Sequence, residues 1–239
     1  AIEALALETN DGGPAVLIGT PWIEEDRLHN SQVLLDQGKV VAARHKYDLP
    51  NYGVFDEKRI FDPGPLPGPI NFKDVRIGVP ICEDVWTPDV VECIAETGGE
   101  LLLVPNGSPF EVGKSDMRIH HAVARVVESG LPLVYLNQIG GQDELVFDGG
   151  SFVMNADRNL AWQMPAWRED LAITHWGRTG NTWQCQQGKT CNIENGLSAI
   201  YQAMTVGLRD YVNKNGFPGV ILGMSGGIDS AISAAVAVD

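Results

Sequence analysis

The sequence has little positive charge, few cysteines and no long apolar run. Its 17 basic against 31 acidic residues give a formal net charge of −14, which argues against a surface for nucleic acid or an anionic membrane. Its four cysteines are too few to build a fold of this length from disulfides, so we expect reduced thiols and a cytoplasmic protein. No stretch approaches the roughly 18 uninterrupted apolar residues of a membrane span, and we expect no membrane partner.

The two ends of the sequence lack the signals of a complete chain. There is no initiator methionine, and residues 1–8 have the pattern of the middle of an amphipathic helix, with no signal peptide visible. Residues 229–239 have the pattern of a helix that stops without a cap. We therefore expect a chain that is cut at both ends.

Strand-like and helix-like segments alternate along most of the chain. Amphipathic spacing predicts helices over 88–97 and 115–129, each followed by glycine. The dipeptide Gln37-Gly38 between two apolar runs predicts a hairpin. Hairpins mixed with β–α repeats predict an α/β fold with a mixed sheet and helices packed on it. The expected strands cover residues 15–20, 31–36, 39–43, 75–79, 101–104, 131–136, 150–154, 160–162 and 171–174.

A change of pattern divides the sequence. From His175 to Asn192 apolar periodicity is missing and Gly, Thr, Gln and Asn are frequent, which is typical of a linker or long loop. A helix over 194–215, a strand over 219–223 and a helix over 228–238 then predict the first βα unit of a doubly wound domain. We thus expect a first domain over residues 1–175, a linker over 176–193 and the start of a second domain over 194–239.

One cysteine has the context of a nucleophile. Cys82 lies in Gly78-Val-Pro-Ile-Cys-Glu-Asp-Val-Trp86, just past an apolar strand. A thiol at that position can point into a cleft while backbone N–H groups face the same point. The attacking species is the thiolate, so the thiol needs a base or a positive neighbour. Taken alone, the position also fits a buried structural cysteine, which is the commoner case.

A second motif, Lys46-Tyr-Asp-Leu-Pro-Asn-Tyr-Gly-Val-Phe-Asp-Glu57, favours the nucleophile. With Cys82 it resembles the nitrilase superfamily, whose members cleave carbon–nitrogen bonds with a Glu-Lys-Cys triad. The resemblance is closer still to the glutaminase domain of glutamine-dependent NAD synthetases, and segments 106–110 and 140–148 also look like that family's signatures. The resemblance implies a nitrilase-like α-β-β-α sandwich whose N-terminal strands are missing here.

The resemblance also implies roles for individual residues. Cys82 would attack the side-chain amide of glutamine, Lys46 would stabilise the tetrahedral oxyanion, and Glu57 would be the second, positioning glutamate. The family's general-base glutamate lies on an earlier strand, and no glutamate near the start of this chain matches its motif. We expect that base to lie outside the chain, so that the fragment alone is inactive. The residues expected to hold glutamine are Tyr52, Glu83, Ser108 and Lys114.

A glycine-rich turn follows the expected strand over 219–223 and opens a helix. Its glycines let the backbone approach a ligand closely, and N–H groups at a helix N-terminus bind phosphate; a helix cap without a ligand is the alternative. No Gly-Lys-Ser/Thr follows this turn at the required spacing, which excludes a Walker A loop here. The string over 225–230 instead resembles the PP-loop of ATP pyrophosphatases. The residues expected to bind ATP are Gly223, Met224, Ser225, Gly226, Gly227, Ile228, Asp229 and Ser230.

Together the two resemblances imply a two-step amide ligase. Ammonia from glutamine would amidate deamido-NAD after ATP has activated its carboxylate, giving NAD, AMP and pyrophosphate. Mg²⁺ would neutralise the phosphates, its ligands are not assigned, and no tightly bound prosthetic group is expected. The expected partners are glutamine, ATP, deamido-NAD and further copies of the chain in a homo-oligomer. Residues 140–149, with Asp143, Glu144 and Asp148, are expected to shape the glutaminase mouth or an ammonia exit.

Other interpretations remain beside this one. A free-standing nitrilase-type amidase is disfavoured by the intact string over 225–230. Another PP-loop amidotransferase, such as a GMP synthetase, is disfavoured by the Lys46–Cys82 pattern. A non-enzymatic assembly piece predicts that neither ATP nor glutamine protects the chain against heat. Cys185 and Cys191 bracket a spacing that a metal site could use, but without a second pair they are expected to be loop cysteines.

Overall fold

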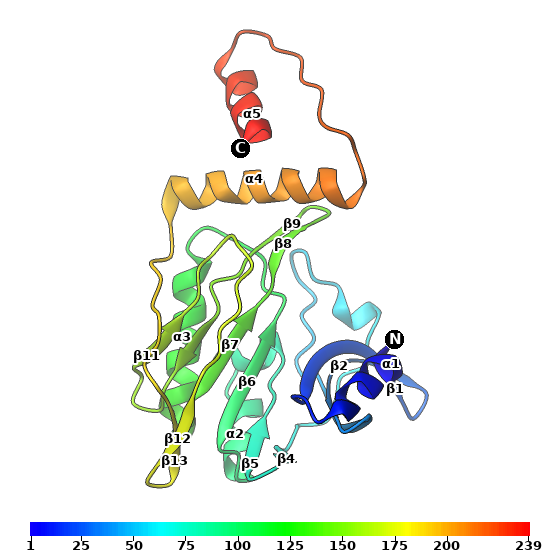
Figure 1. Ribbon diagram of the computed structural model, residues 1–239, viewed down its shortest axis with the longest axis vertical. Coiled ribbons are helices and arrows are strands. Elements are labelled where there is room, and N and C mark those ends of the chain that lie inside the picture. Colours follow the sequence, from blue (N-terminus) through cyan, green and yellow to red (C-terminus); the bar gives the residue numbers. More distant parts are fainter.

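The computed structural model describes all 239 residues (Figure 1). Two main sheets have helices on their outer faces, two further sheets have two strands each, and two helices end the chain. None of these helices combines the length and apolar character needed to cross a membrane. The elements are α1 (Ile2–Glu8), β1 (Val16–Glu24), β2 (Arg27–Asp36), β3 (Lys39–His45), β4 (Ile70–Phe72), β5 (Val75–Gly78), α2 (Asp89–Glu96), β6 (Leu101–Asn106), α3 (Lys114–Ser129), β7 (Leu133–Asn137), β8 (Ile139–Gln142), β9 (Leu145–Asp148), β10 (Phe152–Met154), β11 (Leu160–Gln163), β12 (Trp176–Thr179), β13 (Thr182–Cys185), α4 (Gly196–Lys214) and α5 (Ile228–Val238). Short 3-10 turns cover Thr9–Asp11, Glu57–Arg59 and Cys82–Val85.

The first sheet is antiparallel and has the order β1-β2-β3. Gln37 and Gly38 join β2 to β3 with φ angles of 49° and 78°, the left-handed pair that a tight two-residue hairpin turn needs. The hairpin predicted at this dipeptide is therefore confirmed. It matters for the site because β3 ends at His45, directly before Lys46.

The second sheet is mixed, as predicted, with the order β11-β10-β7-β6-β5-β4. Strands β5, β6 and β7 run parallel, while β4, β10 and β11 pair antiparallel with their neighbours. Alternate residues of the parallel strands, such as Leu102 and Tyr135, are buried against α2 and α3. Those helices present Ile94 and Val126 to the strands at helical spacing, so both predicted helices are confirmed.

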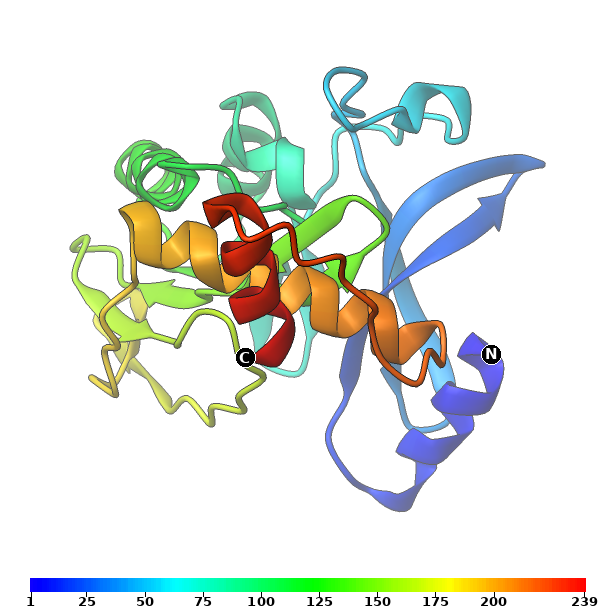
Figure 2. The same cartoon turned by 90° about the horizontal axis from the view of Figure 1, so that it is seen from above.

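The layers follow the order α-β-β-α. Helix α1 packs on the outer face of the first sheet, where Ala6 meets Val33 and Leu35. The other face of that sheet, through Leu34, packs with Ile70 and Val79 of the second sheet region. Helices α2 and α3 cover the far side of the second sheet (Figure 2). The sandwich expected from the motifs is confirmed.

Two expectations for residues 171–192 are wrong. Residues 171–174 form no strand: Leu171 is 88% exposed and the segment has no hydrogen-bonded neighbour strand. The expected loop after them contains the hairpin β12–β13 instead. Its anchor is Asn155, whose side chain donates to the Cys185 carbonyl (3.0 Å) and accepts the Cys185 N–H (2.8 Å). The periodicity of apolar residues does not indicate a tertiary contact of this kind.

The strand predicted over 219–223 is also absent. Extended residues become a strand only when another strand satisfies their N–H and C=O groups, and none lies beside this segment, where Ile221 is fully exposed. Helices α4 and α5 do form as predicted.

Helix α4 docks on the β8–β9 hairpin (Figure 1). There Asp210 accepts the Gly141 N–H at 2.7 Å, and Lys214 Nζ donates to the Gly141 carbonyl at 2.5 Å. A Cβ on Gly141 would lie 3.0 Å from the Cα of Gly207, so only a glycine lets the helix approach this closely.

Candidate active site around Cys82

Cys82 lies at the start of the 3-10 turn that follows β5. Its φ angle is +50°, a left-handed conformation that is uncommon for a residue with a side chain. The neighbouring Asp84 fixes this turn, since its Oδ2 accepts the Ile81 N–H at 2.9 Å. Strained backbone of this kind gathers at functional sites because the surrounding structure must hold it.

Asp84 also ties the cysteine turn to the lysine motif. Its buried carboxylate accepts the backbone N–H groups of Tyr47 (3.1 Å) and Asp48 (2.8 Å), the two residues after Lys46. Desolvation raises the pKa of Asp84 from its usual 3.8 to about 6, against the opposing effect of these hydrogen bonds. The sequence offered no signal for this role except an acid two residues after the cysteine.

Lys46 and Glu57 form an ion pair inside the same cleft. Lys46 Nζ lies 2.6 Å from Glu57 Oε1, and the lysine side chain is only 2% exposed. Asn30 Nδ2 donates to the other carboxylate oxygen at 3.3 Å, and the Asn30 carbonyl accepts the Lys46 N–H at 2.8 Å. A buried ammonium needs such a partner, so the pair holds a cation in place within the cleft.

The cleft has a volume of about 460 Å³ and brings Cys82, Lys46 and Glu57 together. Burial is the largest influence on the thiol and raises the pKa of Cys82. The Lys46 ammonium and the Gly107 backbone N–H act in the opposite direction, since both favour the thiolate. The three residues predicted to be catalytic therefore come from separate segments to one cleft.

Tyr52 and Glu83 meet at the rim of an adjoining cavity. The Tyr52 hydroxyl donates to Glu83 Oε1 at 2.6 Å, and both residues line a space of about 780 Å³ beside the cysteine turn. Burial and this carboxylate raise the pKa of Tyr52 above its usual range. Two of the four residues expected to hold glutamine thus face each other, with the tyrosine half exposed.

Ser108 and Lys114 are both buried, and each is engaged by a neighbour. Ser108 Oγ accepts from Arg118 Nε at 3.1 Å, and the Ser108 N–H donates to Asn137 Oδ1 at 3.0 Å. Lys114 opens α3 and pairs with Glu111. Arg118 and Asn137 therefore hold the segment that follows β6 through hydrogen bonds.

Arg118 makes several of the contacts that hold this segment. Its guanidinium donates to both carboxylate oxygens of Asp148, at 2.9 and 2.8 Å, and both side chains are buried. The same group donates to the carbonyls of Ser108 and Pro109. The segment over 140–149 thus acts on the cleft through Asp148 at the end of β9. Arg118 and Asn137 were not predicted, because a position on a helix face or at a strand end does not indicate that a side chain will hold a neighbouring segment.

The glycine-rich turn lies apart from the cleft, between α4 and α5. Ser225 Oγ lies 3.2 Å from Ser230 Oγ, and the Ser230 hydroxyl donates to the Gly227 carbonyl at 3.0 Å. The turn is exposed and leads into α5 at Ile228, so N–H groups of the first helical turn face solvent. Asp229 is its one carboxylate, and the chain holds no cluster of three or more His, Cys, Asp or Glu side chains. The turn by itself does not fit a magnesium site.

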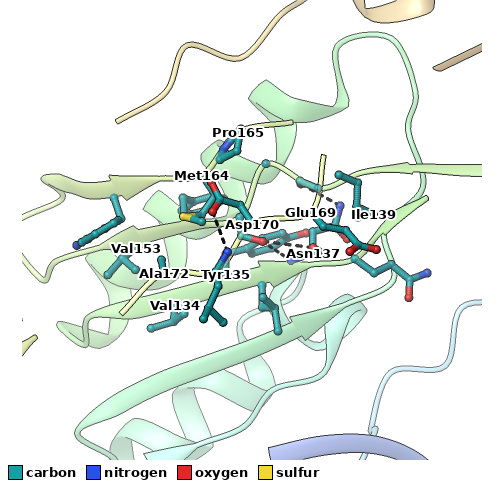
Figure 3. Close-up of a pocket in the computed structure, with 18 of the residues that line it drawn as sticks. Val134, Tyr135, Asn137, Ile139, Val153, Met164, Pro165, Glu169, Asp170 and Ala172 are labelled. Atoms are coloured by element: carbon teal, nitrogen blue, oxygen red, sulfur yellow. Dashed lines mark hydrogen bonds between the residues drawn. The ribbon is translucent and has the colours of Figure 1, made fainter. Parts of the chain in front are cut away.

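A further cavity of about 390 Å³ lies beside β7 and β10, under the segment over 164–174 (Figure 3). Its lining is largely apolar and includes Val134 and Val153, with Glu169 and Asp170 at one side. None of the residues predicted to be catalytic or to bind glutamine or ATP lines it. It shares Leu136, Asn137 and Gln138 with the Cys82 cleft, but neither a cysteine nor a lysine lines it, so the Cys82 cleft is the candidate site.

Comparison with known proteins identifies both parts of the chain. Residues 1–183 match the carbon-nitrogen hydrolase family, and residues 200–239 match NAD synthase. The glutamine-dependent NAD(+) synthetase of Rhodobacter capsulatus is 45% identical over the whole chain, which covers 43% of that relative. That of Acinetobacter baylyi is 40% identical over 90% of the chain and 40% of its own length.

Solved structures agree with the sequence matches. The Acinetobacter baumannii glutamine-dependent NAD(+) synthetase, in complex with ADP, superposes with a TM-score of 0.87 at 40% identity, covering 94% of this chain and 42% of that one. An amidase from Nesterenkonia sp. AN1 superposes with a TM-score of 0.58 at 29% identity, covering 68% and 62%. The chain thus spans less than half the length of the synthetases it matches. It belongs to the carbon-nitrogen hydrolase family, joined to the opening of an NAD synthase domain as in the relatives named glutamine-dependent NAD(+) synthetase.

Proposed function

We propose that residues 1–175 are the glutaminase part of a glutamine-dependent NAD synthetase, with Cys82 as the nucleophile. The observation that carries the proposal is the buried Lys46–Glu57 pair in one cleft with a cysteine in a strained turn. Relatives that cover the whole chain carry this name, and the Nesterenkonia amidase, matched over the same domain, has acrylamide added at its active-site cysteine.

The cleft residues then divide the chemistry of acyl transfer. The Cys82 sulfur, as thiolate, attacks the carbonyl carbon of the glutamine side chain, and the carbonyl π electrons move onto oxygen. Lys46 stabilises that oxyanion, and Glu57 keeps the ammonium in position. Collapse of the intermediate breaks the C–N bond, and the proton first taken from the thiol goes to the nitrogen, which leaves as ammonia. Water then adds to the thioester, yields glutamate and returns a proton to the sulfur.

Glutamine itself would be held at the mouth of the cleft. We assign the Tyr52–Glu83 pair to its ammonium group, since a carboxylate at the rim complements that charge. Ser108 lies on the segment after β6 that Arg118 holds, and Lys114 lies on the first turn of α3. There they would bind the α-carboxylate of glutamine.

The glutamates near Cys82 already have partners within the chain. Glu57 already accepts from Lys46 and Asn30, and Glu83 accepts from Tyr52. We therefore propose that the base comes from outside these 239 residues and that the chain alone is inactive. Glutamate release by this chain that Cys82→Ala abolishes would contradict that statement.

For the second part we propose ATP-dependent amidation. The carboxylate of deamido-NAD attacks the α-phosphorus of ATP, pyrophosphate leaves, and ammonia displaces AMP from the acyl adenylate. Residues 223–230 would hold the pyrophosphate through exposed N–H and hydroxyl groups. Mg²⁺ would accompany ATP as counter-ion, and we assign no ligands to it. We further propose a cytoplasmic homo-oligomer without a tightly bound prosthetic group.

The test uses the complete polypeptide with ATP and deamido-NAD, supplied with either glutamine or ammonium. Cys82→Ala should abolish NAD synthesis from glutamine and leave synthesis from ammonium intact. Cys93→Ala, which replaces a cysteine of α2 that does not line the cleft, is the matched control and should change neither. Glutamine-driven synthesis that survives Cys82→Ala would refute the assignment of the first domain. Glutamine hydrolysis without any ATP use would favour a free-standing amidase.

A further inference from the structure

One side-chain amide of the Cys82 cleft has no partner within the chain and remains open to solvent. Gln32 of β2 lines the cleft and is 7% exposed. Its amide makes no hydrogen bond to protein atoms, and neither of its polar atoms is sealed from solvent. Most buried polar groups are paired, so this amide offers a free donor and a free acceptor to a molecule that enters the cleft.

The strand directs this amide toward the cleft. Alternate residues of β2 point to opposite faces, so Asn30, Gln32 and Leu34 share one face. On that face Asn30 donates to Glu57, and Leu34 packs between the two sheets. The residue paired with Gln32 on β1 is Gly19. A Cβ on Gly19 would lie 2.7 Å from Gln32 Nε2, so the amide occupies room that the glycine leaves free.

Gln32 lies on the side of the reacting centre that is away from the rim. The Asn30 carbonyl accepts the Lys46 N–H, and the chain after Lys46 leads to Tyr52 at the rim. Gln32 lies two residues along β2 in the other direction, where it pairs with Arg44 of β3. With the amino-acid end of glutamine at the rim, Gln32 lies beyond the reacting carboxamide, on the side of its nitrogen.

The chemistry of a carboxamide suits a small neutral molecule at this place. Its Oε1 accepts an O–H, its Nε2 donates to a lone pair, and it takes up no proton near neutral pH. The nearby charges of Lys46 and Glu57 are already engaged with each other. After ammonia has left, the sulfur and the oxyanion donors keep their places. Water therefore reaches the thioester carbonyl carbon from the position that the nitrogen occupied.

We propose that Gln32 holds the water that hydrolyses the Cys82 thioester. The water oxygen forms a bond to the carbonyl carbon, the C–S bond breaks with its electrons on sulfur, and the proton that water loses ends on the sulfur. Gln32 orients the water and keeps its own protons. Its effect falls on the release of glutamate and not on the attack that releases ammonia. The inference rests on the proposed glutaminase function, which supplies the thioester.

Rapid-quench kinetics of the complete polypeptide with glutamine separate the two steps. Gln32→Met, similar in length but without the amide, should lower the rate constant for glutamate release by about tenfold, as the loss of one neutral hydrogen bond implies. The rate constant for ammonia release should stay within about twofold. The control is Gln163→Met, which replaces a buried glutamine outside the cleft that donates to the Gly150 and Ser151 carbonyls. It should not separate the two rate constants.

A second variant leaves Gln32 in the chain. Gly19→Ala places a methyl group against Gln32 Nε2 and displaces the flexible amide, so it should slow glutamate release selectively as well. Its control is Gly177→Ala on β12, where a Cβ meets no atom within 4 Å. If Gln32→Met does not fold, the Gly19→Ala result decides.

The outcomes separate this inference from the function on which it rests. Equal losses of both rate constants in Gln32→Met, or unchanged glutamate release in either variant, would overturn the role of Gln32 and leave the glutaminase in place. An unmodified polypeptide that releases neither ammonia nor glutamate from glutamine would remove the proposed function, and this inference with it.

Discussion

Replacement of Asp84 by asparagine tests how the site is held together. The carboxylate is completely buried, yet it accepts three backbone N–H groups that join the Cys82 turn to the segment after Lys46. Asparagine keeps the shape and removes the charge. The Nδ2 group of asparagine would face one N–H that the carboxylate accepts, so one hydrogen bond is lost. The cost of losing that hydrogen bond does not change with pH, whereas the cost of burying the charge does.

The size of the pH effect follows from the raised pKa of Asp84. A carboxyl with a pKa of about 6 when folded and about 3.8 when unfolded binds its proton more tightly in the folded state. The stabilisation is complete below about pH 4 and is lost as the pH rises through 6. The difference between the two pKa values corresponds to about 3 kcal/mol. The free energy of unfolding of the wild-type chain, relative to Asp84→Asn, should therefore fall by about 3 kcal/mol between pH 4 and pH 8.

Urea unfolding of both chains across this pH range measures the effect, because all other titrations are common to the two and cancel. Asp143→Asn, which removes an exposed carboxylate on the β8–β9 turn, is the control and should run parallel to the wild type. A difference between wild type and Asp84→Asn that does not change with pH would refute the raised pKa and the cost of burying this charge.

Three further predictions follow from contacts around the site. Lys46→Met removes the cation that favours the thiolate and so raises the pKa of Cys82, and alkylation of Cys82 by iodoacetamide near pH 8 should slow; an unchanged rate would contradict this. Gly141→Ala places a Cβ against Gly207 and should loosen α4, at a cost of about 1–3 kcal/mol, seen as faster proteolysis of that helix. Arg118→Met leaves a buried carboxylate unpaired and should lower the free energy of unfolding by about 3–5 kcal/mol.

Local signals were enough to predict most elements of the fold. The hairpin around Gln37-Gly38 and the helix ended by Gly130 depend on backbone preferences that the residues themselves carry. The expectation of a loop after His175 was wrong because β12–β13 is held by Asn155, which is distant in sequence. The strand expected over 219–223 has suitable residues but no neighbour to pair with. Strands depend on partners, and a single segment does not reveal them.

The candidate site was likewise predicted only in part. Cys82, Lys46 and Glu57 were expected from motifs, and the structure brings them into one cleft. The groups that hold them there were not expected, since Asp84 and Arg118 act through backbone atoms of other segments. Almost every residue carries a backbone carbonyl and an N–H. The spacing of residue types therefore does not indicate which backbone group a side chain will bind.

The pairing of buried polar groups distinguishes support from function in this cleft. Asp84 accepts three N–H groups, and Arg118 pairs with Asp148, so these charges are satisfied within the chain and act on the backbone. The Lys46–Glu57 pair differs from them, because both of its members line the cleft of Cys82. Asp84 and Arg118 therefore hold the backbone around the site, whereas Lys46 and Glu57 are the buried charges placed to meet a substrate.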